Sequence, residues 1–232
     1  MKKSLINLFA LLVILSNAQS QDLNLKNKKY LCISAGIGAD YVNVPDVVDY
    51  ITSISGKKIN EFDGALELWI SPELKIDKNT SVKLEYSYIT KQYNVEETST
   101  GASLIYNFTY QIHSPTLSID HLVFQEKEIY IIKLGAGIGF VKGYFKQFLP
   151  ISLKEINYTS NGGIFKLEAI FSSRLDGKVY VHLSTDLKLS LTSEARDEDG
   201  NKLIIRKPFG EDRNLRLNFF GLAIRAGFSY YF

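Results

Sequence analysis

The alternation of apolar and polar residues with a period of two, along almost the whole chain after Tyr30, most constrains the possible folds. Successive side chains of a β-strand point to opposite faces, so this pattern predicts strands with one apolar and one polar face. In the first such segment, Ile33 and Ile37 share a face that is opposite to Ser34 and Asp40. The chain is therefore expected to be all-β.

Eight segments show this pattern and are expected to form antiparallel strands. They span residues 31–41, 62–71, 82–89, 104–111 with a continuation to 124, 132–140, 165–172, 179–191 and 220–232. Because proline removes a donor from the strand ladder, we expect a bulge or break at Pro115. If the stretches on either side of Pro115 were two strands, and one further hairpin existed elsewhere, the strand count would be ten.

The connections between these segments alternate in length. The short ones are residues 72–80, 125–128 and 175–177, and the long ones are residues 42–61, 143–161 and 193–214. Short turns at one end and long loops at the other are typical of outer-membrane barrels, and two termini on the short-turn side require an even strand count. The sequence thus predicts a closed antiparallel up-and-down transmembrane β-barrel of about eight strands, each spanning roughly 9–11 residues.

The N-terminal residues have the features of a secretory signal peptide. Lys2 and Lys3 precede an apolar run from Leu5 to Leu15, and Ser16-Asn17-Ala18 forms a cleavage site before Gln19. The run is shorter than the roughly 20 apolar residues of a membrane-spanning helix, and no later run approaches that length, so an embedded chain has to be a barrel. The expected regions are a signal peptide (1–18), a short periplasmic segment (19–29) and an outer-membrane barrel (30–232).

Charge and cysteine content bear on nucleic-acid binding, disulfide formation and lipid attachment. A formal net charge of +2 gives no indication of nucleic-acid binding. Cys32 is the single cysteine, so an intramolecular disulfide is excluded. The polar segment 19–29 separates Cys32 from the apolar run, which argues against lipid attachment and favours a buried or lipid-facing free thiol.

Three features indicate that the apolar faces point outward, to lipid. The last segment is apolar at every second position from Phe220 to Phe232, as in the C-terminal signal that the barrel-insertion machinery recognises. Tyr and Phe residues gather near strand ends, where outer-membrane barrels carry aromatic girdles. The polar faces carry opposite charges that can pair across a narrow lumen, namely Lys83, Glu85, Lys166, Glu168, Asp186, Lys188, Glu67 and Arg225.

This orientation predicts which side chains face lipid. Leu84, Leu167 and Ile224 are expected to face lipid, and their neighbours on the opposite faces are expected to point into the lumen. A secreted lipocalin-like barrel would have the two faces inverted.

The segment 112–117 (Ile-His-Ser-Pro-Thr-Leu), followed by the glycine-rich segment 134–139 (Leu-Gly-Ala-Gly-Ile-Gly), resembles the β-barrel domain of many porin-family outer-membrane proteins. The whole mature chain is similar to the small OmpA- and OmpX-like barrels. The resemblance implies the fold and the outer-membrane location but transfers no functional residue. Gly135, Gly137 and Gly139 are expected to leave room in the lumen for large side chains such as Tyr231 or Arg225.

Two histidine patterns are candidate sites. His182 and Ser184 form a His-x-Ser pair of the kind found in lipid A deacylases, with Glu194 or Asp186 as a possible orienting acid. Alternation points both His182 and Ser184 into the lumen, away from lipid, which argues against catalysis. A second pair, the histidines at positions 113 and 121, shares a face without a third metal ligand. No catalytic, cofactor-binding or metal-binding residue is therefore assigned.

Two long loops have features of their own. The loop from Ser193 to Asn214 is rich in charge, which predicts a solvated extracellular loop or, alternatively, contacts with lipopolysaccharide phosphates or divalent ions. The loop from Val42 to Glu61 carries apolar residues at helix-like spacing, at positions 47, 48, 51 and 54. We expect a short helix that packs against the barrel mouth, with adhesion as the alternative.

The function expected from these features is that of an integral outer-membrane barrel with a structural, adhesive or envelope-integrity role, and not of an enzyme. An eight-stranded lumen is largely filled by side chains. The alternatives are a narrow porin-like channel, a lipid-modifying enzyme that uses His182 and Ser184, and a secreted lipocalin-like ligand binder. The expected partners are outer-membrane lipids and lipopolysaccharide, and the insertion machinery through the strand ending at Phe232. Neither nucleic acid nor a cofactor is expected.

Overall fold

The computed structural model describes residues 31–59, 62–99, 102–127, 129–149, 154–206 and 211–232. The predicted signal peptide and the segment 19–29 lie outside these residues and stay predictions. In the described part of the chain, we find no helix of the length and apolar character needed to span a membrane.

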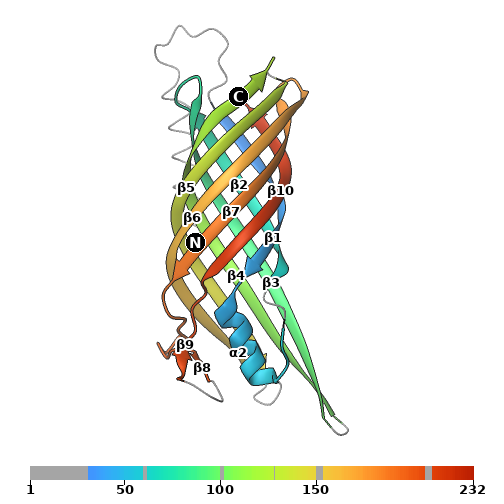
Figure 1. Cartoon of the computed structure of the whole chain (residues 1–232), viewed down its shortest axis with the longest axis vertical. Coiled ribbons are helices and arrows are strands. Elements are labelled where there is room, and N and C mark those ends of the chain that lie inside the picture. The colour runs from blue at the N-terminus through green and yellow to red at the C-terminus, as the bar shows by residue number, and fades with distance from the viewer. Residues whose placement is uncertain (1–30, 60–61, 100–101, 128, 150–153, 207–210) are drawn as a thin grey trace.

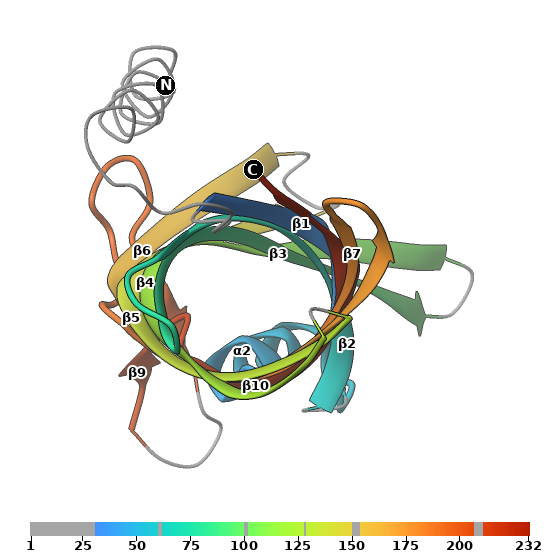
Figure 2. The ribbon, with the colours of Figure 1, turned by 90° about the horizontal axis from the view of Figure 1, so that it is seen from above.

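Eight antiparallel strands close into a barrel, which confirms the predicted architecture (Figures 1 and 2). They are β1 (Leu31–Asn43), β2 (Phe62–Lys75), β3 (Thr80–Ser99), β4 (Ala102–Glu126), β5 (Tyr130–Leu149), β6 (Lys154–Asp176), β7 (Val179–Thr192) and β10 (Phe219–Tyr231). Each strand pairs with its neighbours along the chain, and β1 pairs with β10 to close the ring. The segment between β7 and β10 holds a small separate sheet of β8 (Ile204–Ile205) and β9 (Arg213–Asn214).

No bulge lies at Pro115, but the predicted break is found in part: in the ladder between β4 and β5, Ser114 and Pro115 have no partner. β4 is continuous through Pro115, which pairs with Tyr86 on β3. On the β5 side the register is the same at His113 and at Thr116, so the missing donor does not shift the ladder. The register shift between β4 and β5 lies further along, between residues 122 and 124.

The four strands β3 to β6 are longer than predicted, and the expected loop over residues 143–161 is mostly strand. They have 20, 25, 20 and 23 residues, whereas β1, β2, β7 and β10 have 13 or 14. A membrane-spanning strand needs only about 9–11 residues. The excess forms a tall wall at the end of the barrel opposite the short turns, as Figure 1 shows for β3 and β4. We call this part the extracellular wall.

The polarity of the two faces inverts along these long strands. On β4, Phe108 and Tyr110 point inward in the extracellular wall, whereas Ser118 and Asp120 point inward in the membrane-spanning part. On the outer face, exposed Leu117 belongs to the membrane-spanning part. The physical reason is the change of surroundings, because the wall is surrounded by water and needs an apolar core. The apolar positions therefore change phase near Pro115 without any irregularity of the backbone.

The predicted helix is confirmed as α2 (Pro45–Ser55). Proline suits the first turn of a helix, and Gly56 ends α2 in the left-handed conformation with φ of 65°. Val47, Val48 and Ile51 are buried on one side of α2. Seen along the barrel in Figure 2, the helix lies inside the outline of the ring at the wall end.

The orientation of the barrel faces is confirmed by the residues chosen to test it. Leu84, Leu167 and Ile224 are 38%, 43% and 60% exposed, whereas Lys83, Glu168 and Arg225 are 2%, 4% and 1% exposed. A continuous apolar outer face of this kind has no stable place in water, and it suits the hydrocarbon core of a membrane. The inverted arrangement of a soluble ligand carrier is thereby excluded.

Candidate functional site

The lumen of the membrane-spanning part holds a network of buried charges. At the end nearest the extracellular wall, Lys188 on β7 lies 3.2 Å from Asp40 on β1 and 2.7 Å from Glu67 on β2. Arg225 on β10 then contacts Glu67 at 3.4 Å and also forms an ion pair with Asp186. The cations thus connect carboxylates from strands on different sides of the barrel.

The network continues towards the short turns through two more lysines. Lys166 Nζ lies 2.9 Å from Glu85 Oε1 and 3.3 Å from Glu168 Oε2. Lys83 Nζ lies 2.5 Å from Glu168 Oε1 and 3.4 Å from Asp120 Oδ2. The predicted pairing of charges across the lumen is confirmed, and no residue of this network has more than 4% of its surface exposed. We call this set the charge network.

Glycine and tryptophan fit around the large cation of the network. A Cβ atom at Gly38 would lie 2.8 Å from Arg225 Cγ, so β1 needs a glycine at this position. The guanidinium carbon lies 4.4 Å from the centre of the Trp69 ring, which makes a cation–π contact. The glycines on β5 were predicted to leave room for Tyr231 or Arg225, and this is wrong for Gly135. A Cβ atom at Gly135 would meet Asp120 and Glu168. Neighbouring side chains of the charge network occupy that space, and Arg225 fits against Gly38.

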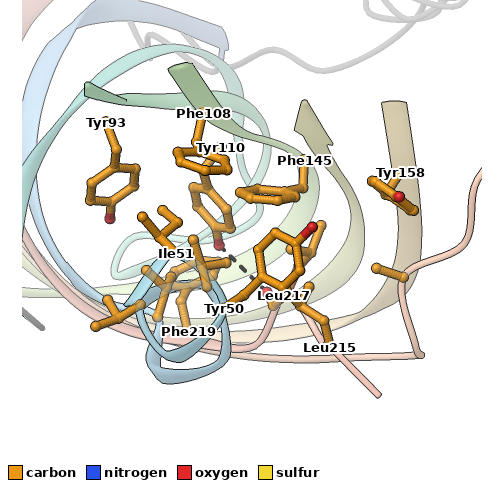
Figure 3. Close-up of a cluster of buried hydrophobic side chains, with 14 of the residues drawn as sticks. Tyr50, Ile51, Tyr93, Phe108, Tyr110, Phe145, Tyr158, Leu215, Leu217 and Phe219 are labelled. Carbon is orange, nitrogen blue, oxygen red and sulfur yellow. Dashed lines mark hydrogen bonds between the residues drawn. The ribbon is translucent and has the colours of Figure 1, made fainter. Parts of the chain in front are cut away.

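An apolar plug fills the lumen on the extracellular side of the charge network, inside the extracellular wall (Figure 3). It consists of the buried residues Val42, Val44, Val47, Val48, Tyr50, Ile51, Ala65, Ile89, Tyr93, Val95, Tyr106, Phe108, Tyr110, Ile112, Val141, Phe145, Tyr158, Ile164, Ala195, Leu203, Ile205, Leu215, Leu217 and Phe219. Tyr50 on α2 packs edge-on against Phe145 with ring centres 5.6 Å apart. Its hydroxyl donates a hydrogen bond to Gln147 at 2.5 Å.

The loop from Ser193 to Asn214 is only partly the solvated loop that was predicted. Leu203 and Ile205 are buried in the plug, as are Leu215 and Leu217 just after the loop. The alternate spacing of positions 203 and 205, and of 215, 217 and 219, is the signal that could have identified this inward face. The loop therefore closes the side of the mouth where the neighbouring strands are short.

Ion pairs hold α2 in place. Arg213 Nη2 lies 2.9 Å from Asp46 Oδ1 and 2.5 Å from Asp49 Oδ2. The backbone N–H of Arg216 donates to Asp46 Oδ2 at 2.9 Å. Since Asp46 and Asp49 lie on α2, the loop between β7 and β10 is tied to the helix as well as to the plug.

The charged part of the same loop forms its own contacts. Glu194 accepts hydrogen bonds from Lys202 and from Asn214, and these contacts lower the pKa of the Glu194 carboxyl below its ordinary value. Asp197 accepts hydrogen bonds from Asn201, which lower the pKa of the Asp197 carboxyl. Among the described residues we find no cluster of side chains suited to hold a metal ion.

The structure does not assemble the His-x-Ser pair into a catalytic unit. His182 Nδ1 lies 3.3 Å from Ser229 Oγ, and its ring packs on Trp69 at 4.9 Å. Within the described part of the chain the Ser184 hydroxyl has no hydrogen-bond partner. Both candidate acids are occupied elsewhere, Asp186 by Arg225 and Glu194 by Lys202. His182 and Ser184 are buried in the lumen, as predicted, and have no access to lipid.

His113 and His121 both lie on the outer face of β4, as their even spacing predicted. They are eight positions apart on one strand, which corresponds to roughly 26 Å at about 3.3 Å per residue. His113 instead lies in a group of tyrosines, within 2.6 Å of the Tyr86 hydroxyl. The two histidines therefore cannot share a ligand.

Comparisons with solved structures give the fold its known counterparts. Neisserial surface protein A aligns with a TM-score of 0.50 and 11% identity, over 87% of this chain and 97% of that protein. Ail, the attachment invasion locus protein of Yersinia pestis, was solved in complex with the heparin analogue sucrose octasulfate. It aligns with a TM-score of 0.50 and 13% identity, over 88% of this chain and 100% of Ail. A major outer membrane protein from Thermus thermophilus aligns with a TM-score of 0.51 and 14% identity, over 87% and 99%.

No family model and no curated protein matches the sequence. The chain therefore has the fold of small bacterial outer-membrane β-barrels, while the low identities carry no specific role. The apolar outer face is the one that this fold presents to membrane lipid.

Proposed function

We propose that this chain is an integral protein of a bacterial outer membrane that presents a fixed extracellular surface for structural or adhesive contacts and does not conduct ions. The observation that carries this proposal is the filling of the lumen in two successive layers. The charge network fills the membrane-spanning part, and the apolar plug fills the extracellular wall.

Each layer opposes conduction for its own reason. In the charge network, cations such as Lys166 and Lys188 are held between carboxylates, and moving them aside would leave buried charges unpaired at a cost of several kcal/mol each. In the plug, the rings of Tyr50, Phe108 and Phe145 are in mutual contact, so an ion would have to pass through an apolar layer. A narrow porin-like channel is therefore disfavoured.

The extracellular wall supports a role in surface contacts. β3 and β4 pair without a register shift from Thr80 and His121 to Ser99 and Ala102, so the projecting hairpin continues the ladder of the barrel. Its base is fixed by the plug residues Tyr93 and Tyr106. One structural neighbour, Ail, was solved with a heparin analogue, so heparin is the first ligand chosen for the adhesion test.

Conductance in planar lipid bilayers tests the closed lumen. The refolded protein is expected to insert without ohmic current steps under conditions in which a general porin gives regular steps. Heat-modifiable gel mobility of the same sample confirms that the barrel is folded. Regular current steps in most insertions would contradict the proposal.

The adhesive role requires a separate test on whole cells. Replacing residues 97–104 by Asn-Gly shortens the hairpin beyond the plug, and cells carrying the shortened protein are expected to attach less to heparin-coated or protein-coated surfaces. The matched control is the full-length protein at equal surface abundance. If cells with the shortened protein attach as well as cells with the full-length protein, on the heparin coating and on the protein coating, the adhesive role is wrong. The structural role is then tested by comparing the detergent sensitivity of cells with and without the protein.

A further inference from the structure

A groove on the outer face of the barrel contains no residue of the charge network or of the apolar plug, although Trp69 of its lining also contacts Arg225. It has a volume of about 540 Å³ and crosses β2, β3 and β4. Its lining residues are Leu68, Trp69, Ile70, Tyr86, Tyr88, Gln111 and His113. No carboxylate belongs to this lining, whereas several hydrogen-bond donors do.

The groove lies where the outer face changes from apolar to polar. On β5, Ile138 and Phe140 are exposed apolar residues, and the next outward positions are Lys142 and Tyr144. His113 pairs with Lys142 in the register between β4 and β5. This change marks the boundary between hydrocarbon and lipid headgroups on the extracellular side of the membrane.

After the hydrogen bonds within the groove are formed, its side chains still have polar hydrogens that can be donated to a ligand. The Tyr86 hydroxyl and His113 Nδ1 are 2.6 Å apart, and one hydrogen makes this bond. A neutral histidine and a tyrosine carry one polar hydrogen each, so one hydrogen remains available whichever atom donates. Gln111 Nε2 donates to the Tyr88 hydroxyl at 2.9 Å, which leaves the Tyr88 hydrogen available as well. The site is thus suited to an acceptor-rich group.

Aromatic packing fixes the imidazole of His113. Its ring centre lies 4.9 Å from that of Tyr88 and 5.4 Å from that of Tyr144. Lys142 Nζ lies 5.3 Å from the Tyr144 ring centre, beside the same group. Lys142 is exposed, and no carboxylate of the described residues forms an ion pair with it. A positive charge therefore stands at the polar edge of a groove whose other edge is apolar.

We propose that this groove binds one lipid A molecule of the outer leaflet, with a phosphate at Lys142 and His113 and an acyl chain along Leu68 and Ile70. This inference rests on the proposed outer-membrane location. Ammonium and N–H groups suit the phosphate, and the apolar floor suits the chain that emerges beneath it. Neutral donors and an apolar floor in the groove, with the cation Lys142 beside it, distinguish the site from scattered surface lysines.

The test uses the full-length barrel and the variants Lys142→Gln and Lys146→Gln. Lys146 is the matched control, because it also faces outward on β5 but lies further from the membrane, near Glu155. Binding is measured by native mass spectrometry of barrels in detergent micelles doped with lipid A. We expect Lys142→Gln to weaken lipid A binding roughly tenfold, as for loss of one charge-assisted hydrogen bond, and Lys146→Gln to leave it unchanged.

Two further lipids distinguish the chemistry of the ligand. Dephosphorylated lipid A is expected to bind wild-type protein as weakly as lipid A binds Lys142→Gln. Equal binding of phosphatidylglycerol and lipid A would overturn the choice of lipid A, and equal lipid A binding by Lys142→Gln and wild type would overturn the site. Fractionation of the membranes separates these failures from that of the proposed function, because a wild-type protein absent from the outer membrane refutes the location itself.

Discussion

Arg225 on β10 and Glu85 on β3 meet inside the barrel, with Nη2 3.1 Å from Oε2, although β1 and β2 separate their strands in the ring. The same guanidinium contacts Glu67 on β2 and Asp186 on β7. One cation therefore connects carboxylates from three strands, two of which also pair with lysines, Glu67 with Lys188 and Glu85 with Lys166.

Removing this cation should destabilise the barrel strongly. In Arg225→Met the buried carboxylates of Glu67, Glu85 and Asp186 lose their common partner, and breaking a buried ion pair in this way costs about 3–5 kcal/mol. Urea unfolding in lipid vesicles, followed by heat-modifiable gel mobility, measures the change. Arg225→Lys keeps a charge and should lose less. Equal unfolding midpoints for Arg225→Met and wild type would show that the network does not stabilise the barrel.

A charge placed on the outer apolar face tests the membrane orientation. Ile224 lies near the middle of β10 and is 60% exposed, so Ile224→Arg places a guanidinium in hydrocarbon. We expect a loss of about 2–4 kcal/mol in the free energy of unfolding from vesicles. The control is Gln92→Arg, at an exposed position of the extracellular wall, with an expected change close to zero. A similar loss at both positions would contradict the assignment of the apolar outer face to membrane lipid.

The seam between β1 and β10 tolerates no side chain at Gly36. A Cβ atom there would lie 2.1 Å from the backbone oxygen of Ala226, which cannot move aside without disturbing the ladder. Gly36→Ala is expected to cost about 1–3 kcal/mol, as overpacking does. In Gly163→Ala, on β6, the new Cβ would meet its nearest atom at 3.8 Å, so this variant should fold normally. Indistinguishable refolding yields and midpoints for the two would refute the predicted close approach.

Packing of α2 depends on the fully buried Ile51. Ile51→Ala leaves a cavity in the apolar plug, and such changes cost about 2–5 kcal/mol in well-packed cores. Limited proteolysis of the folded barrel should cut residues 44–59 faster in this variant than in wild type. Ser53→Ala, at an exposed position of the same helix, is the matched control. Unchanged cleavage in Ile51→Ala would mean that the helix is held mainly by the Arg213 ion pairs.

The carboxyl of Glu194 should titrate below its ordinary pKa of 4.5, because Lys202 and Asn214 donate hydrogen bonds to the charged form. A lowered pKa in the folded state means that this contribution to loop stability is present above pH 4.5 and is lost as the pH falls through the lowered value. Carboxyl NMR titration of the barrel in micelles measures it. Lys202→Ala should raise the pKa towards 4.5, and Lys57→Ala should not. A Glu194 pKa at or above 4.5 in the wild type would refute this.

The membrane-spanning part of the fold was readable from the sequence because one simple rule governs it. Between residues 31 and 41 or 220 and 232, the environment of each face is constant, so apolar residues recur at every second position. The number of strands, the apolar outer face and the charged side chains in the lumen were all predicted from this pattern. The partners of individual charges did not, because pairs such as Arg225 and Glu85 depend on barrel closure.

The extracellular wall was harder to predict because its surroundings reverse. Inward positions such as Phe145 become apolar, while outward positions such as Lys146 become polar, so the alternation continues with the opposite meaning. If the apolar positions are assumed to face lipid along the whole strand, the exchange of polarity looks like the end of the strand. Residues 143–161 are then assigned to a loop. The groove at His113 was missed for a related reason, since its residues come from several strands and form no local motif.

The position of Arg225 on β10 has a consequence for biogenesis. A partial chain that ends before β10 has the acidic side chains of β2, β3 and β7 but lacks the guanidinium that they share. Such a chain would keep Lys188 beside Glu67 and Lys166 beside Glu85. However, Asp186 would lose its ion-pair partner and the ring would lack the strand that closes it, so the chain would resist entry into the bilayer. Premature termination would therefore yield a product that stays in the periplasm, accessible to proteases, and does not become a leaky pore.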